Sequence, residues 1–134
     1  MMREIKFRAW FEDKYYEVAS IDWTRKRVYL KLGSLESMRV PFSLVVLEQY
    51  TELKDKNGKE IYEGDIVNGE VFGYREHIVQ HGEYDNGQTL PEDNISGYGW
   101  YIIRIDLERD TTQPLHKNLA VVGKIREVLI NERF

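Results

Sequence analysis

The first third of the chain alternates apolar and polar residues with a period of two, which is typical of β-strands that bury one face. Residues 5–11, 15–23 and 27–32 have strand-like composition, and short polar turns separate them. The pattern predicts three antiparallel strands joined by short loops. A further strand is expected over residues 38–42. The apolar run 44–47 fits either a buried strand or one helical turn, of which we favour the strand.

The middle of the chain, residues 49–67, predicts a hairpin followed by a second corner. The dipeptide Asn57-Gly58 favours a type I′ turn, whose twist matches the strands on either side of it. Gly64 relaxes the backbone at the second corner, and Asp65 is placed to accept hydrogen bonds from nearby amides before a new strand begins. Apolar residues on both arms of the hairpin are expected to anchor it on a core: Leu53, Ile61 and Tyr62.

Glycines and turn residues divide the second half of the chain into short strand-like segments. The corner sequence Gly-Asp-Ile-Val resembles the opening of the first strand in small SH3-like barrels. We therefore predict an all-β fold, in which an antiparallel N-terminal sheet packs with a small SH3-like C-terminal barrel and helical turns are short. Residues 1–50 are expected to form the N-terminal β subdomain and residues 51–134 the hairpin plus barrel, packed as one unit. Strands are expected at 71–72, 76–80, 100–107 and 119–128, a helical turn at 114–119, and the longest loop over 82–99.

Three segments carry a family resemblance: residues 2–10, 49–67 and 122–125 are similar to the YopX family of phage and prophage proteins. The resemblance covers nearly the whole chain and implies a β-rich fold. It also implies a location in the cytoplasm of a bacterial host, because phages and integrated prophages carry such proteins. It transfers no catalytic or ligand-binding residues. Glu52 stands where a glycine is common in similar sequences, and residues 84–95 resemble nothing that we can place.

Composition narrows the function classes. The net charge is −4 with both signs interspersed, which disfavours attraction of the whole molecule to nucleic acid or an anionic membrane. The chain has no cysteine, which excludes disulfides, thiolate metal sites and a cysteine nucleophile. No apolar run approaches the length of a membrane span, so we expect a soluble, intracellular protein without membrane contact.

Patterns that carry chemistry are weak in this sequence. His77 and His81, four residues apart, are the nearest match to a metal pair, but zinc would need further ligands brought in by folding. We favour the alternative of two polar residues on a half-exposed strand, and we expect no metal and no cofactor. The serines lie in no nucleophile-elbow context, the glycines form no phosphate loop, and the carboxylates at 106, 108 and 110 resemble a solvated edge. The protein is therefore expected not to be an enzyme.

Aromatic residues, 13% of the chain, point to binding instead. Our leading hypothesis is a non-catalytic protein that contacts a host or phage protein through open strand edges or through the aromatic residues Tyr84, Tyr98, Trp100 and Tyr101, which flank the long loop. Open edges also favour self-association. The alternative is a nucleic-acid-binding module that uses the basic and aromatic hairpin from Trp23 to Tyr29. Its guanidinium groups and aromatic faces would contact phosphates and stack on bases, and its members are Trp23, Arg25, Lys26, Arg27 and Tyr29. Packing within the protein's own sheets is the default role for both groups.

Overall fold

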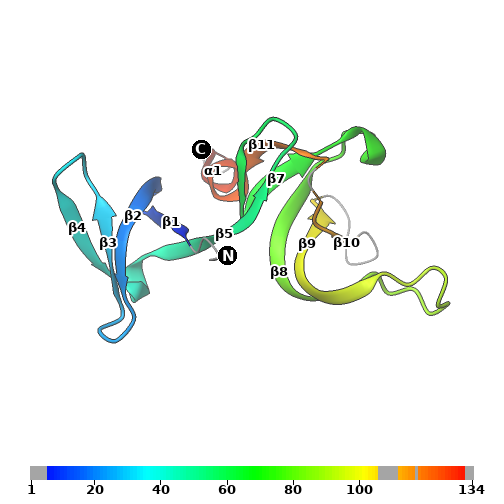
Figure 1. Cartoon of the computed structure of the whole chain (residues 1–134), viewed down its shortest axis with the longest axis horizontal. Coiled ribbons are helices and arrows are strands. Elements are labelled where there is room, and N and C mark those ends of the chain that lie inside the picture. Colours follow the sequence, from blue (N-terminus) through cyan, green and yellow to red (C-terminus); the bar gives the residue numbers. More distant parts are fainter. Residues whose placement is uncertain (1–5, 106–111, 117, 132–134) are drawn as a thin grey trace. The chain divides into compact units, whose positions relative to one another are not determined.

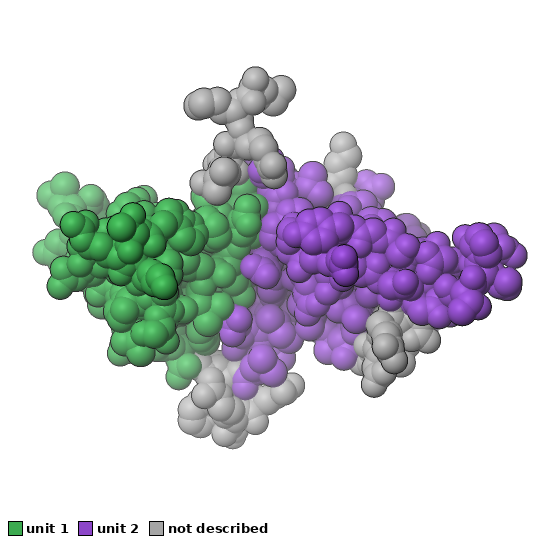
Figure 2. Space-filling view, turned by 90° about the horizontal axis from the view of Figure 1, so that it is seen from below, with its two compact units in different colours: residues 1–50 green, residues 51–134 purple. Residues whose placement is uncertain are grey.

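The structure is a computed structural model, which describes residues 6–105, 112–116 and 118–131. Its strands form two antiparallel sheets, and the described part of the chain holds a single α-helix of seven residues (Figure 1). The predicted all-β class is therefore confirmed. The chain divides into two compact units, residues 1–50 (unit 1) and 51–134 (unit 2), which Figure 2 colours separately. That the two units pack together stays a prediction.

Unit 1 is a sheet built from neighbours in the sequence, with the order β4-β3-β2-β1-β5-β6 continuing into unit 2. Its strands are β1 (Phe7–Phe11), β2 (Lys14–Asp22), β3 (Arg27–Lys31), β4 (Ser37–Pro41) and β5 (Val46–Lys54), the last of which crosses into unit 2. The three N-terminal strands predicted from the alternation are confirmed. One face buries the apolar core of the unit: Ala9, Val28, Leu30 and Val40.

The other face of β1 is partly covered by a polar contact that alternation did not predict. Arg8 Nε donates to Glu48 Oε1 at 2.8 Å, and the Tyr15 hydroxyl donates to the same oxygen at 2.7 Å. Glu48 is only 2% exposed because this pairing and the strand register place it between the two donors. The run 44–47 is divided between a 3-10 turn, η1 (Phe42–Leu44), and the start of β5.

Unit 2 contains a five-stranded sheet with the order β10-β9-β8-β7-β11. Its core is formed by fully buried aliphatic side chains: Ile61, Val67, Val79, Ile102 and Leu119. Leu53 packs against this core and Ile61 is part of it, so this predicted anchoring of the hairpin is confirmed. Closure of the sheet into an SH3-like barrel stays a prediction. The elements of the unit after β5 are β6 (Glu60–Tyr62), β7 (Asp65–Asn68), a 3-10 turn η2 (Glu70–Phe72), β8 (His77–Asp85), β9 (Ser96–Arg104), β10 (Gln113–Pro114), β11 (Ala120–Lys124) and α1 (Ile125–Asn131).

The turn between β5 and β6 differs from the predicted type I′ geometry. That turn needs positive φ at both central residues, whereas of Asn57 and Gly58 only the glycine has it, at +83°. A carboxylate organises the loop instead. Asp55 Oδ1 accepts hydrogen bonds from the amides of Asn57 and Lys59, both at 2.8 Å, and its Oδ2 accepts from the amide of Val121 at 2.9 Å. Asp55 thereby fastens the hairpin loop to β11.

Four other expectations for unit 2 were wrong. Part of the segment 82–99 is in strands and not in a loop, because β8 extends to Asp85 and β9 begins at Ser96. Residues 71–72 belong to a 3-10 turn. The expected helical turn at 114–119 begins with the short edge strand β10, where proline is tolerated because no ladder donor is needed. The last strand ends at Lys124 and a helix follows. Residues 106 and 107, the end of the expected strand 100–107, lie outside the described residues.

Candidate binding surfaces

The β8–β9 hairpin over residues 78–103, whose closed end projects from unit 2, is called the arm below (Figure 1). The two strands pair antiparallel, so that His81 lies opposite Trp100 and Glu83 lies opposite Tyr98. Because side chains alternate along a strand, Tyr98 and Trp100 share one face and Tyr101 lies on the other. The protruding end of unit 2 in Figure 2 lies where Figure 1 places the loop that closes the arm.

One face of the arm presents an aromatic row that becomes more exposed toward the tip. Trp100 packs against the core of unit 2, and the His81 ring meets it edge-on at 4.6 Å between ring centroids. The same His81 ring meets Tyr98 edge-on at 5.3 Å. Tyr98 itself is 74% exposed. The row therefore runs from a partly buried tryptophan to an accessible tyrosine.

The other face of the arm carries a stacked pair of tyrosines. The rings of Tyr84 and Tyr101 lie 5.3 Å apart with an interplanar angle of 29°, and the Tyr101 hydroxyl donates to Gln80 Oε1 at 2.8 Å. Tyr84 also covers Gly97, where a Cβ atom would lie only 2.8 Å from the tyrosine hydroxyl. An aromatic ring laid over a cross-strand glycine stabilises a strand that the glycine alone would weaken. This covering explains how Gly97 is accommodated inside β9.

The loop that closes the arm, residues 86–95, is held by its own polar side chains. Asn86 is 5% exposed, and its Nδ2 donates to the carbonyl of Asp93 at 2.9 Å. Asn94 Nδ2 donates to the carbonyl of Gln88 at 3.0 Å, while its Oδ1 accepts from the Ser96 hydroxyl at 2.8 Å. The loop is thus ordered around two asparagines.

The arm is also acidic. Between residues 78 and 103 the sequence has no lysine or arginine, and its four carboxylates are Glu83, Asp85, Glu92 and Asp93. All four side chains belong to exposed residues. The arm therefore combines accessible aromatic surface with a charge of −4, equal to that of the whole chain.

The predicted basic hairpin of unit 1 holds its cations against a carboxylate. Arg25 and Arg27 both approach Asp22 Oδ2, at 3.3 and 3.7 Å. The Arg25 amide also donates to Asp22 Oδ1 at 3.0 Å, and this bond is the main cause that lowers the pKa of Asp22. Lys26 lies exposed at the turn. One carboxylate therefore compensates part of the positive charge that would attract phosphates. Nucleic-acid binding through this hairpin stays a prediction.

Trp23, at the same hairpin, is 62% exposed but not isolated. Its ring meets Phe7 edge-on at 6.0 Å and Phe42 edge-on at 5.5 Å between ring centroids. With Lys6 and β2 residues 18–21, Phe7 and Trp23 line a shallow cavity of about 310 Å³. The tryptophan therefore both packs within unit 1 and forms a wall of that cavity.

The two histidines considered as a metal pair have different environments. His77 is 2% exposed, so the expectation of a half-exposed position was wrong for it, whereas His81 is exposed and packs within the aromatic row. His77 Nδ1 lies 3.0 Å from the carbonyl oxygen of Arg75. A carbonyl only accepts, so Nδ1 carries the proton. Within the described residues, no three histidine or acidic side chains lie close enough together to hold a metal ion.

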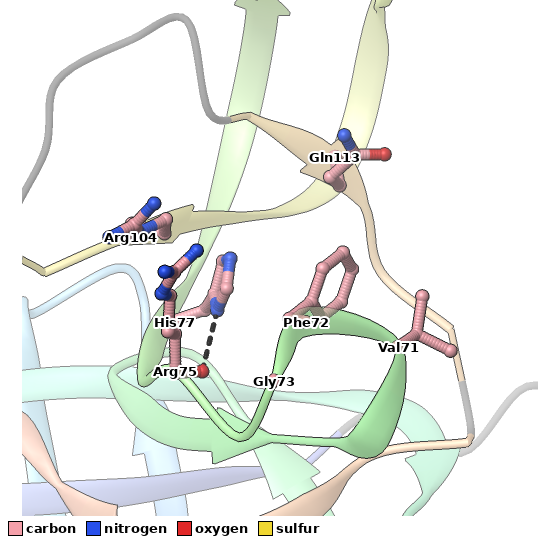
Figure 3. A pocket seen from close by; sticks show the side chains of 7 residues that line it. All are labelled: Val71, Phe72, Gly73, Arg75, His77, Arg104 and Gln113. Atoms are coloured by element: carbon pink, nitrogen blue, oxygen red, sulfur yellow. Dashed lines mark hydrogen bonds between the residues drawn. The ribbon is translucent and has the colours of Figure 1, made fainter.

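A cavity of about 470 Å³ lies in unit 2 beside η2 (Figure 3). Arg75, His77 and Arg104 form one side of it, and Figure 3 shows both guanidinium groups next to the histidine ring. Val71 and Phe72 form the opposite side, with Gln113 above them. Sequence reasoning singled out only His77 from this group, because the residues come from separate elements and no spacing in the sequence links them.

The family model of the YopX protein matches residues 6–127, which is nearly the whole chain. The chain belongs to the YopX family. This confirms the resemblance noted in the sequence, and YopX membership suggests a phage-type protein. Among curated proteins, none matches this YopX chain at a significant level. Over the described residues, the structure contains no helix with the length and apolar character needed to cross a membrane.

Proposed function

We propose that this YopX protein is a non-catalytic binding protein whose arm docks onto a positively charged surface of another protein, from the phage or from its host. The observation that carries the proposal is the coincidence of an accessible aromatic row with a net charge of −4 on one projecting hairpin. Aromatic residues are enriched at protein interfaces, because they bury a large area with little loss of conformational entropy. The arm presents such a residue, Tyr98, at an accessible position.

Charge determines the kind of partner. Complementary charge accelerates encounter between proteins and selects against partners of the same sign. The four carboxylates of the arm therefore favour a partner rich in lysine and arginine. The same carboxylates repel the phosphates of nucleic acid, so the arm itself is better suited to a protein than to DNA or RNA.

The anchoring of the row supports the proposal energetically. The His81 ring contacts both Trp100 and Tyr98, so the Tyr98 side chain is already partly ordered and loses little conformational entropy when a partner covers it. Truncation of an aromatic residue at such a central interface position typically costs about 1–2 kcal/mol of binding free energy. Loss of Tyr98 is therefore expected to weaken docking by about five- to thirtyfold.

The experiment compares the wild-type chain with arm variants as bait in a lysate of phage-infected bacteria. The arm variants are Tyr98→Ser and the charge reversal Glu83→Lys with Asp85→Lys. The matched control is Leu35→Ser, which changes a side chain that is 97% exposed in unit 1. Circular dichroism of each variant verifies that it is folded.

The proposal requires a protein that wild type and control retain and both arm variants lose. Once purified, that partner must have a basic surface, bind directly in calorimetry, and bind more weakly as salt increases. Retention of the same proteins by the arm variants would contradict the proposal, and so would a partner whose affinity does not respond to salt.

A further inference from the structure

We propose that the cavity beside η2 binds a nucleotide, with the phosphate between Arg75 and Arg104 and the base between Phe72 and Gln113 (Figure 3). The inference is separate from the arm, because the residues involved lie outside residues 78–103. A failure of one proposal therefore leaves the other standing.

The cationic side of the cavity fits a phosphate group. Arg75 and Arg104 bring two guanidinium groups to one wall, and none of the seven lining residues carries a carboxylate. A guanidinium group donates two parallel hydrogen bonds to a phosphate, and charge-assisted bonds of this kind are about twice as strong as neutral ones. An anion held between both groups gains from each of them.

His77 adds a directed polar group to the same side. The bond from its Nδ1 to the Arg75 carbonyl fixes the plane of the ring. The fixed ring turns Nε2 away from that carbonyl, and Figure 3 shows this nitrogen pointing toward the space between Arg104 and Gln113. Nε2 accepts a hydrogen bond when the ring is neutral and donates one when it is protonated.

The opposite side of the cavity fits a flat, largely apolar group. Val71 and Phe72 line it, and the Phe72 ring contacts two histidine rings, with ring centroids 4.7 Å from His77 and 5.9 Å from His116. A ring fixed in this way offers a preorganised contact for a planar ligand. Gln113 offers an amide that both donates and accepts, which is the pattern that pairs with the edge of adenine.

Size excludes a simple inorganic anion as the full occupant. A cavity of about 470 Å³ lies within the range of small-molecule sites, roughly 300–1,000 Å³. Phosphate alone would fill the cationic side and leave the wall of Val71 and Phe72 uncovered. A nucleotide covers both walls, either as a free molecule or as the phosphorylated end of a single strand.

The test is a titration of the isotopically labelled full chain, observed through its amide resonances in NMR. The four probes are AMP, adenosine, inorganic phosphate and a short single-stranded DNA with a 5′-phosphate. The variants are Arg75→Gln, Arg104→Gln and Gln113→Leu. The matched control is Arg39→Gln, which removes the same charge from an exposed residue of unit 1.

We expect AMP to shift the amides of residues 71–77, 104 and 113. Loss of either arginine is expected to weaken AMP binding roughly tenfold, and so is Gln113→Leu. Arg39→Gln should leave the affinity for AMP unchanged. Adenosine and phosphate should each bind at least about tenfold more weakly than AMP. If the phosphorylated strand binds more tightly than AMP, and Arg75→Gln weakens its binding by the same factor, the site is supported and its ligand is the 5′-phosphorylated end of a single strand.

Two results would overturn the inference. One is the absence of any shift in these amides at about 5 mM AMP. The dissociation constant would then be larger than that of any functional site of this kind. The other is equal binding of AMP and inorganic phosphate, which would show that the site does not recognise a nucleotide. Arg75 is exposed, so its substitution leaves a folded protein even if Arg104→Gln does not.

Discussion

Two hairpins of unit 2 contain the same turn dipeptide and have opposite roles. Asn57-Gly58 lies between β5 and β6, and Asn86-Gly87 lies at the end of the arm. Gly58 and Gly87 have nearly the same backbone conformation, with φ of +83° and +81°. Yet the first hairpin is fastened to the core of the unit, whereas the second projects and presents its side chains.

The difference lies in where the polar side chains of each loop form their hydrogen bonds. One carboxylate oxygen of Asp55 accepts hydrogen bonds from amides of its own loop. The other accepts one from the amide of Val121, 66 residues further along the chain. In the arm, the side chains of Asn86 and Asn94 bond to groups within residues 85–96. The dipeptide thus determines local backbone geometry, and the neighbouring side chain determines whether a hairpin joins the core.

The largest expected effect is the loss of the long-range bond from Asp55. In Asp55→Asn, either orientation of the new side chain sets its amide nitrogen against a backbone N–H group, that of Val121 or those of Asn57 and Lys59, so donors face each other. We expect the free energy of unfolding to fall by about 3 kcal/mol, because a buried donor then lacks its acceptor. Urea denaturation followed by far-UV circular dichroism measures the change.

The matched control for this prediction is Asp93→Asn in the arm. Asp93 is exposed and takes part in its loop through its backbone amide and carbonyl, so the same chemical change should alter stability by less than about 0.5 kcal/mol. Equal effects at the two aspartates would show that the two loops do not differ as described.

The same carboxylate gives the first hairpin a pH dependence. Burial alone would raise the pKa of Asp55, but the hydrogen bonds from the amides of Val121, Lys59 and Asn57 outweigh burial and lower it. A lowered pKa in the folded state means that the stabilising contribution is present above the unfolded value of about 3.9 and is lost as the pH falls through the folded value. The loss below about pH 4 should be smaller in Asp55→Asn, and an identical acid profile would contradict this assignment.

An intermediate effect of opposite sign is expected at Glu52. This residue has φ of +71°, a left-handed conformation that glycine adopts without cost and other residues disfavour by about 1 kcal/mol. We expect Glu52→Gly to raise the free energy of unfolding by up to about 1 kcal/mol in urea denaturation. The control Lys54→Gly, without positive φ in the same strand, should lower it instead. A loss of stability in Glu52→Gly would show that the glutamate side chain outweighs the strain.

The smallest effect on global stability is expected for Asn94→Ala. Its bonds lie within an exposed loop, so we expect a change below about 0.5 kcal/mol in the free energy of unfolding. The loop itself should open more often. Amide hydrogen exchange should therefore accelerate at residues 86–95 and stay unchanged in β7 and β11. Faster exchange in β7 would mean that the arm supports the core after all.

Much of the fold follows from local patterns. The alternation over residues 5–32 sufficed for β1, β2 and β3, because short turns leave few other ways to pair neighbouring strands. The aromatic and acidic character of the arm is also legible in the sequence, since residues 78–103 contain no lysine or arginine. The helix α1 had a signal that the strand interpretation overlooked: Ile125, Val128 and Leu129 have helical spacing.

Features that depend on distant residues could not be predicted. The bond from Asp55 to Val121 and the covering of Gly97 by Tyr84 both need the folded register. Burial of His77 depends on contacts with the Arg75 carbonyl and the Phe72 ring. The cavity beside η2 assembles from residues that no sequence motif connects. Single-sequence patterns describe neighbours along the chain, and these sites are made by neighbours in space.

Gly82 and Gly99 lie opposite each other in the arm, and their φ angles of +141° and +143° are open to few residues with a side chain. Figure 1 shows β8 and β9 as curved ribbons. The direction of the arm is therefore encoded at two positions that contribute no side chain to its surface. Evolution or an engineer could redirect the tip by changing this pair, while the tyrosines and carboxylates that a partner would recognise stay the same.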